Sequence, residues 1–276
     1  MRLLLVLSVV AACASQPRCP IEQPIAQGQP FLWKASKGGD IVWLYGTIHD
    51  AGLDAVPPVA LAALEHSTRL VSELGDVPPD PDVFREHARI EKGKGIDQLL
   101  PTDDWWDLRD ALLGKIKEDD LRRVRPWYAM SLLTSAFSPT PGPSMDSELT
   151  DRARELAKPI EALETWQDQL ALLDRVIGIP DLQEAIHARK TMRCDLTRML
   201  GAYRAGDLVT MQALLVVPRT EETLLTARNR AWFPQIEKQF AQGGAFVAVG
   251  LGHLLGDNGL VIMLQHAGYT VERVAR

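Results

Sequence analysis

Two apolar runs with the composition of buried β-strands lie near opposite ends of the sequence. The first covers residues 41–45 and the second residues 245–249, and both are rich in the β-branched and aromatic residues that strands favour. A glycine at the end of a strand permits a turn or a close approach of the backbone. Each run ends in a glycine followed three residues later by a histidine, namely Gly46 with His49 and Gly250 with His253. The pattern therefore predicts two matched strand–Gly-x-x-His units.

Shorter strands and amphipathic helices are predicted along the rest of the chain. Runs bounded by turn residues predict strands at residues 31–35, 69–74, 159–164 and 269–274, of which the first pairs with 41–45 as a hairpin. A 3.6-residue periodicity and helix start signals predict helices over residues 57–66, 80–92, 101–137, 147–158, 165–176, 180–206, 219–242 and 257–267. Pro234 predicts a kink in the helix over 219–242.

The order of these elements, sheet then helices then sheet, predicts the fold class. It is typical of a mixed α/β protein whose mainly parallel sheet is built by the N- and C-terminal parts, with a helical lobe inserted between them. A chain of 276 residues suits one such domain. We expect a signal segment over residues 1–12, a tether over 13–30 and a single domain over 31–276, with a lobe at about 101–240 that the strand at 159–164 interrupts.

Charge and hydropathy narrow the classes of partner. The net charge is −6, and no stripe of Lys and Arg with interleaved aromatic residues is present, so nucleic-acid binding is not expected. No run of about 18 apolar residues follows the N-terminus, so no transmembrane helix is expected in the mature protein. A peptide or small-molecule substrate is the expected partner.

The first residues have the form of an export signal. A positive charge precedes an apolar run over residues 3–10, and Val-Ala-Ala-Cys at 10–13 resembles a bacterial lipobox. In that resemblance Cys13 becomes the lipidated first residue of the mature chain, and Ala14 in place of Asp favours the outer membrane. Ordinary signal cleavage after Ala12 or Ala14 is the alternative. Both routes lead to the bacterial envelope, either as an outer-membrane lipoprotein that faces the periplasm or as a soluble periplasmic protein.

The cysteines agree with export. If Cys13 carries a lipid, Cys19 and Cys194 remain, and an even pair in an oxidising compartment favours a disulfide. Two unrelated thiols are the alternative. The sequence has no C-x-x-C motif and no Cys/His spacing of a zinc ribbon, so a zinc ribbon is excluded.

Three side chains at predicted strand ends have the chemistry of a catalytic site. His49 and His253 end the two matched units, and Glu73 lies near the end of the strand at 69–74. In open α/β sheets, ligand sites form at the carboxyl ends of strands. Two imidazoles and one carboxylate are typical ligands of a catalytic transition metal, zinc included, and leave positions for water and substrate. The alternative is that each histidine is simply exposed or hydrogen-bonded.

Four further polar residues are candidates to contact this set or the substrate. Glu164 also ends a predicted strand, and Asp146 follows a Pro-rich break; a role at a helix N-terminus is the alternative for both. Arg228 and Asn229 lie within a predicted helix, where a solvated charged face is the alternative. A Gly-rich phosphate loop, a Gly-x-Ser-x-Gly elbow and a reactive Cys–His pair are absent from the sequence.

Taken together, these motifs resemble those of the TraB/GumN family, which includes the Tiki-type metalloproteases and the pheromone-shutdown proteins. The resemblance covers about residues 30–275 and rests on LYGTIH at 44–49, VSEL at 71–74, MDSEL at 145–149, KPIEALET at 158–165, RNR at 228–230, VAVGLGHL at 247–254 and GYTV at 268–271. It implies the α/β fold of erythromycin-esterase-like and ChaN-like proteins, with a site formed by the two Gly-x-x-His histidines and the glutamate. For Tiki-type members it implies metal-dependent peptide hydrolysis with manganese or cobalt. The lipobox-like start differs from the membrane anchor of those members.

The leading hypothesis is metal-assisted hydrolysis of a peptide or related acyl bond by an exported enzyme. In this hypothesis the ion is held by His49, Glu73 and His253, and these ligands or the substrate are contacted by Asp146, Glu164, Arg228 and Asn229. A first alternative keeps the fold without a metal: His49 is a general base and Glu73 orients water, as in erythromycin-esterase-like enzymes. A second alternative is a non-catalytic envelope protein that sequesters a peptide or haem.

Overall fold

A six-stranded sheet forms the centre of the part of the chain that the computed structural model describes, which is Cys19 and residues 28–275. The strands are β1 (Leu32–Lys37), β2 (Asp40–Thr47), β3 (Arg69–Ser72), β4 (Ile160–Ala162), β5 (Ala245–Gly250) and β6 (Thr270–Arg273). Their order in the sheet is β4-β3-β5-β2-β1-β6. The pairs from β4 to β2 are parallel, whereas β1 is antiparallel to both β2 and β6. The mixed, mainly parallel α/β fold predicted from the sequence is confirmed.

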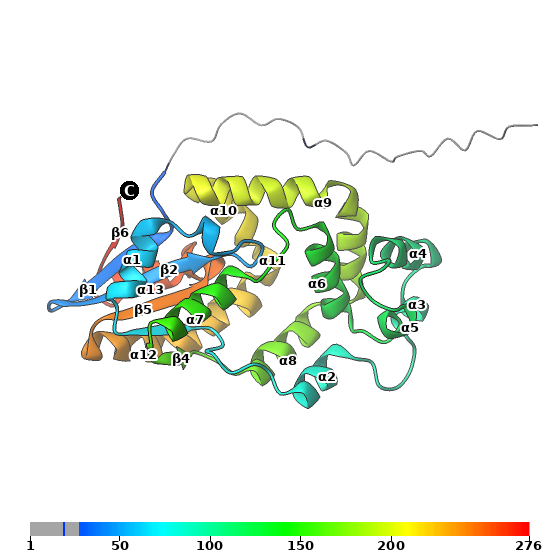
Figure 1. Cartoon of the computed structure of the whole chain (residues 1–276), viewed down its shortest axis with the longest axis horizontal. Coiled ribbons are helices and arrows are strands. Elements are labelled where there is room, and N and C mark those ends of the chain that lie inside the picture. The colour runs from blue at the N-terminus through cyan, green and yellow to red at the C-terminus, as the bar shows by residue number, and fades with distance from the viewer. Residues whose placement is uncertain (1–18, 20–27, 276) are drawn as a thin grey trace, which may run out of the picture.

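Helices surround this sheet and build a separate lobe. They are α1 (Pro58–His66), α2 (Pro81–Ala88), α3 (Ile96–Leu99), α4 (Thr102–Ala111), α5 (Glu118–Leu121), α6 (Pro126–Phe137), α7 (Met145–Glu155), α8 (Trp166–Val176), α9 (Ile179–Ala205), α10 (Leu208–Leu215), α11 (Pro218–Glu221), α12 (Ala227–Gln242) and α13 (Leu260–His266). Short 3₁₀ turns lie at Leu53–Ala55 and Leu251–Leu254, and a π-helical turn lies at Glu222–Thr226. Figure 1 shows the sheet at one end of the molecule and the lobe with α2 to α6 and α8 at the other.

Most elements lie where the sequence predicts them, and the exceptions have local causes. The stretch 101–137 is divided into α4, α5 and α6, because Gly114 adopts a φ of 78° after α4 and Pro126 begins α6. β3 ends at Ser72, so Glu73 lies just beyond the strand. The helix predicted over 219–242 contains the π-helical turn, and α10 precedes it as a separate element.

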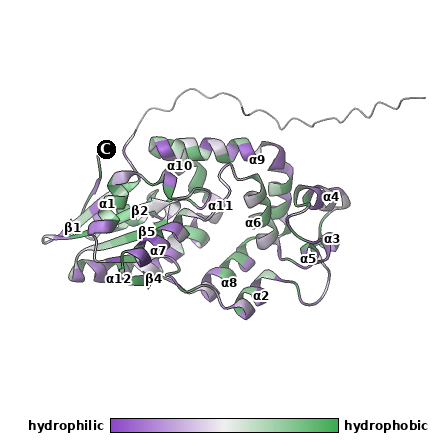
Figure 2. Cartoon of the chain, in the orientation of Figure 1, coloured by the Kyte–Doolittle hydropathy of each residue, from purple (hydrophilic) through white to green (hydrophobic). Residues whose placement is uncertain are grey.

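Three hydrophobic cores divide the described residues, and the smallest consists of Ala88, Trp127 and Leu170 from α2, α6 and α8. The largest core lies on the sheet and includes the apolar residues of α7 and α12, whereas a second core links α3, α4, α6 and the first part of α9. The hydrophobic colour of β5 in Figure 2 marks the buried centre of the largest core. The inserted lobe thus has its own core between Ile96 and Ile186, and α7 and α12 pack with the sheet.

A disulfide joins Cys19 to Cys194 in α9, with the two Cα atoms 5.1 Å apart. The pair predicted from the cysteine count is therefore present. Cys13, the predicted lipidation site, lies outside the described residues. Within residue 19 and residues 28–275, no helix has the length and hydropathy needed to cross a membrane.

The parallel strands bring the sequence motifs to one edge of the sheet. β2, β3, β4 and β5 all point their carboxyl ends the same way, and they lead directly into the segments with His49, Glu73, Glu164 and His253. The two Gly-x-x-His turns touch, because a Cβ on Gly46 would lie 2.5 Å from Leu251 Cδ1 and 3.1 Å from Leu251 Cα. Glycine at position 46 thus allows the two turns to pack closely.

Candidate functional site

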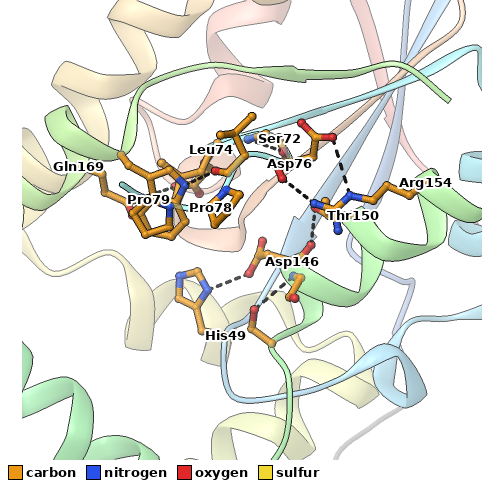
Figure 3. Close-up of a pocket in the computed structure, with 16 residues that line it drawn as sticks. His49, Ser72, Leu74, Asp76, Pro78, Pro79, Asp146, Thr150, Arg154 and Gln169 are labelled. Carbon is orange, nitrogen blue, oxygen red and sulfur yellow. Dashed lines mark hydrogen bonds and ion pairs between the residues drawn. The ribbon is translucent and has the colours of Figure 1, made fainter. Parts of the chain in front are cut away.

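A hollow of about 690 Å³ opens beside this edge of the sheet. Its wall is formed by His49, residues 72–79, Ser144, Asp146, Ser147, Thr150, Arg154, Trp166 and Gln169. Figure 3 shows the labelled residues of this wall, with His49 directed at Asp146. The loop after β3 supplies an apolar part with Leu74, Val77 and two prolines, and α7 supplies a polar part. The hollow therefore offers both apolar and polar contacts.

His49 stands in the open part of the hollow and is paired with Asp146. Its side chain is 74% exposed, and its Nδ1 lies 2.8 Å from Asp146 Oδ2. Thr47 Oγ1 donates to the other carboxylate oxygen at 2.5 Å. The charge of Asp146 and its hydrogen bond raise the pKa of His49 to about 9. Nδ1–H therefore donates to Asp146 and leaves Nε2 as the ring nitrogen available to other partners.

The start of α7 fixes the position of Asp146. Ser144 caps the helix by accepting the backbone N–H of Ser147, and the side chain of Met145 is fully buried. Asp146 lies in the first helical turn, where the helix dipole favours a negative charge. Burial acts to raise the pKa of its carboxyl group, but His49 and Thr47 more than offset burial and hold that pKa below its usual value.

A second, buried group lies behind this pair and is centred on Arg228. Every N–H of its guanidinium has a partner. Nε donates to Glu164 Oε2 at 3.1 Å, and Nη2 donates to Glu164 Oε1 at 2.7 Å and to Glu73 Oε2 at 2.5 Å. Nη1 donates to the carbonyl of Leu224 at 3.1 Å and lies 2.9 Å from His253 Nε2. The guanidinium also lies over the ring of Trp232 at 4.5 Å.

The hydrogen bonds of His253 define its tautomer. Its Nδ1 lies 2.7 Å from Asn229 Oδ1, and the amide nitrogen of Asn229 donates to the carbonyls of His253 and Asn258. Nδ1–H therefore donates, and Nε2 accepts from Arg228, which has no acceptor. The side chain is only 4% exposed, and burial lowers the pKa of His253 to about 4. His253 is thus a neutral imidazole at neutral pH.

Glu73 connects the second Gly-x-x-His unit to α8 and α12. Its Oε1 accepts the backbone N–H of Gly250 at 2.7 Å and lies 3.8 Å from His253 Nε2. Its Oε2 accepts from Arg228 and, at 3.3 Å, from Gln169 in α8. Burial acts to raise the pKa of this carboxyl group, but the adjacent His253 and Arg228 hold it below its usual value.

Glu164 is the second carboxylate of the buried group. It follows β4 and pairs with Arg228 through both oxygens. Its backbone N–H donates to the carbonyl of Glu73 at 2.9 Å, which ties the ends of β3 and β4 together. Burial raises the pKa of the Glu164 carboxyl group despite the ion pair with Arg228. The two carboxylates and one guanidinium form a fully hydrogen-bonded buried network.

The donor atoms do not form a ready metal site in this arrangement. Among the described residues, no group of three or more His, Cys, Asp or Glu side chains is placed to hold a metal ion. The physical reason is the position of Arg228, whose nitrogens meet His253 Nε2 and Glu73 Oε2, two atoms that the predicted ion needs. The residues present therefore fit a guanidinium cation rather than an added divalent ion.

All seven predicted site residues lie in these two groups. The exposed pair contains His49 and Asp146, and the buried network contains Glu73, Glu164, Arg228, Asn229 and His253. The sequence analysis did not single out Thr47, Gln169 and Trp232. Thr47 lies within the first Gly-x-x-His motif, and Trp232 follows Arg228 by four residues, a spacing that places both on one helix face. These spacings are the sequence signals that point to Thr47 and Trp232. No comparable signal in the sequence points to Gln169.

Two other histidines, His187 and His66, lie outside these two groups. His187 Nε2 lies 2.8 Å from the largely buried Asp104 and ties α9 to α4 in the lobe. The ring of His66 bonds the carbonyl of Ala62 within α1. Both histidines therefore make structural contacts within or between helices.

The sequence was compared with known proteins and families. No curated protein and no solved structure matches the chain in these comparisons. The model of the TraB/PrgY/gumN family matches residues 31–273, a range that contains the whole sheet, both Gly-x-x-His turns and every residue of the two groups described above. The chain therefore belongs to the TraB/PrgY/gumN family.

Proposed function

We propose that this protein is a hydrolase that cleaves a peptide or related acyl bond in the hollow, with His49 as the general base. The observation that supports this proposal is the His49–Asp146 pair, which opens onto the hollow while the Glu73–Arg228 network lies directly behind it. A histidine oriented by a carboxylate is a common arrangement for proton transfer during hydrolysis. The apolar loop after β3 suits an apolar side chain or acyl group of a substrate.

The protein's own residues supply the following proton path. In its neutral form, which a pKa of about 9 makes dominant only at alkaline pH, His49 Nε2 accepts a proton from water as the water attacks the acyl carbon. Asp146 keeps Nδ1–H in place and stabilises the imidazolium that forms, and Thr47 holds the carboxylate oxygen that does not face the ring. The imidazolium then returns the proton to the leaving amine or alkoxide. Glu73, ionised beside Arg228, adds a second fixed acceptor at the wall of the hollow.

Metal-dependent hydrolysis is the second candidate. The observation that favours it is the tautomer of His253, whose Nδ1–H is held by an amide oxygen so that Nε2 keeps a lone pair; metal-bound histidines are commonly oriented by such a hydrogen bond. The resemblance to Tiki-type members implies manganese or cobalt. Arg228 bonds that lone pair in this structure, so the residues as placed do not fit a metal ion.

The cellular setting is also a proposal. An export signal with lipidation at Cys13 would place the protein at the periplasmic surface of a bacterial outer membrane. The Cys19–Cys194 disulfide supports export, because disulfides persist in oxidising compartments such as the periplasm. Labelling with a fatty-acid probe tests the anchor: Cys13→Ser should abolish the label and release the protein from membranes.

The hydrolase proposal is tested with the purified mature protein and a panel of peptides and carboxylic esters. We expect turnover that falls at least about a hundredfold in His49→Ala, while His266→Ala, which changes an exposed histidine of α13 outside the hollow, stays at the parental rate. Activity should survive chelation by EDTA. Loss on chelation with recovery by Mn²⁺ or Co²⁺ would select the metal-dependent candidate. Tight binding of a peptide or haem without any turnover would reject hydrolysis in favour of sequestration.

A further inference from the structure

We infer that the guanidinium of Arg228 is the built-in cation of this site, and that its removal opens a metal site formed by Glu73, Glu164 and His253 Nε2. This inference concerns the same site as the proposed function and rests on that function only for what the site does. Its test measures metal binding and stability instead of hydrolysis. Arg228 acts as a positioning residue: it fixes Glu73 and His253, and all its donors are engaged within the protein.

The inference is based on the observation that every N–H of the Arg228 guanidinium has a partner within the protein. A guanidinium has five N–H groups and no acceptor, and here each N–H meets one of four partners: Glu73, Glu164, His253 and the carbonyl of Leu224. Side chains of both carboxylates are 11% exposed and that of Arg228 is 15% exposed. Arg228 thus binds the same three side chains that would be the nearest ligands of an ion at this point.

Charge balance gives the same result. Two carboxylates, one guanidinium and a neutral His253 carry a net charge of −1 in a buried place, and removal of Arg228 would leave −2. Buried charges are costly unless a counter-charge meets them. A single divalent cation would neutralise the two carboxylates, and the free Nε2 of His253 would supply a nitrogen ligand. The space left by the guanidinium would thus suit a divalent ion both in charge and in the type of donor atoms around it.

The helix around Arg228 holds the guanidinium in place. The π-helical turn Glu222–Thr226 immediately precedes α12, and the N–H of Ala227 bonds the carbonyl of Glu222 across five residues. The carbonyl of Leu224 accepts from the Arg228 side chain, and the Trp232 ring lies beneath it at 4.5 Å. π-Turns recur at functional positions in helices. These contacts fix Arg228 between the carboxylates, where an ion would otherwise lie.

The test compares untagged parent, Arg228→Gln and the matched control Arg230→Gln, all stripped with EDTA. Arg230 is two residues away, its side chain is 61% exposed, and it forms a surface ion pair with Glu222. We expect Arg228→Gln to bind one equivalent of Co²⁺ by calorimetry and visible absorption, and its melting temperature to rise with Co²⁺. Parent and Arg230→Gln should show neither effect. Arg228→Gln combined with His253→Gln should lose the gained site.

Two results would overturn the inference. One is a parent protein that binds one equivalent of Co²⁺, Mn²⁺ or Zn²⁺ with Arg228 present. The other is an Arg228→Gln variant that folds, as judged by circular dichroism, and binds no metal. If Arg228→Gln folds only when Co²⁺ is present, the inference is supported. If Arg228→Gln does not fold at all, Arg228→Lys provides the test. Its retained positive charge should exclude Co²⁺, and binding of one equivalent of Co²⁺ by this variant would refute the inference. None of these measurements depends on hydrolytic activity. A failure of this inference would therefore not count against the proposed hydrolysis, which has its own test.

Discussion

His49 and His253 end matched turns, yet their surroundings give them opposite protonation states. Asp146 raises the pKa of the exposed His49 to about 9, whereas burial lowers the pKa of His253 to about 4. Pairs of titratable groups whose pKa values are pushed apart are typical of acid–base sites. The residue types of this site could be predicted from motif chemistry. Their partners could not, because Arg228 and Glu73 are 155 residues apart and only the folded arrangement brings them together.

Asp146→Asn is expected to lower the pKa of His49 from about 9 toward its ordinary 6.5, since the carboxylate charge is the main cause of the shift. The measurement is the pH dependence of the His49 ring proton signals in NMR spectra. Asp50→Asn serves as the control because Asp50 contributes least among the named charges, and it should change the pKa only slightly. A titration in Asp146→Asn that still centres near 9 would contradict the ion pair.

The same pair makes a signed contribution to stability. Because the folded pKa of His49 lies above its ordinary value, the stabilisation is fully present below about pH 6.5 and is lost as the pH rises through about 9. The difference in melting temperature between the parent and Asp146→Asn should therefore shrink from pH 6 to pH 10. A difference that stays constant over this range would show that Asp146 stabilises the fold by another route.

Glu73→Gln is expected to lower the free energy of unfolding by about 2 kcal/mol. Glu73 is not an uncompensated buried charge, since Arg228 donates to it, as do the backbone of Gly250 and the side chain of Gln169. The amide has the same shape but removes the negative charge that Arg228 faces. Urea unfolding gives the measurement, with Glu161→Gln as the control on the more exposed neighbouring strand β4. An unchanged or raised stability would mean that Glu73 is not held by Arg228.

At the scale of elements, close packing between turns decides where the histidines lie. The strands and most helices follow from local periodicity and from Pro and Gly signals, so their ranges could be predicted. The π-helical turn before α12 and the contact between the two Gly-x-x-His turns could not, because both depend on tertiary packing. The break within 101–137 was visible in the sequence as Gly114 and Pro126, but helical periodicity on both sides outweighed them.

Gly46→Ala is expected to destabilise the protein by about 1–3 kcal/mol, because the added Cβ would meet Leu251 at 2.5 Å. Gly201→Ala is the matched control: it lies in α9, and a Cβ there meets nothing within 4 Å. Alanine in that helix should stabilise by about 0.5–1 kcal/mol. The measurement is chemical unfolding of both variants. Equal stability of the two variants would show that the turns tolerate separation.

At the scale of the whole molecule, a long covalent loop ties the N-terminal segment to the helical half. The disulfide joins positions 175 residues apart, and so large a loop restricts the unfolded chain strongly. The cysteine count favoured this pair over two unrelated thiols, because only two cysteines remain if Cys13 carries a lipid as proposed.

Cys194→Ser is expected to lower the free energy of unfolding by about 2–5 kcal/mol. The measurement is the denaturant midpoint of the oxidised parent against the variant. Reduced parent is the control and should match Cys194→Ser. A reduced parent as stable as the oxidised one would show that the disulfide fixes the tail without stabilising the domain.

The position of this disulfide also sets the reach of the protein from a membrane. With a lipid on Cys13 as proposed, six residue steps lead to Cys19, and these span at most about 20 Å. Among the described residues, the next attachment to the domain is Gly28, whose backbone N–H donates to the carbonyl of Ala205; it lies fifteen residue steps, or at most about 50 Å, from Cys13. Formation of the disulfide would therefore shorten this tether by more than half and keep the middle of α9 close to the lipid headgroups. If the chain is lipidated at Cys13 as proposed, the redox state of the Cys19–Cys194 pair thus sets how far the folded domain can extend from the membrane surface.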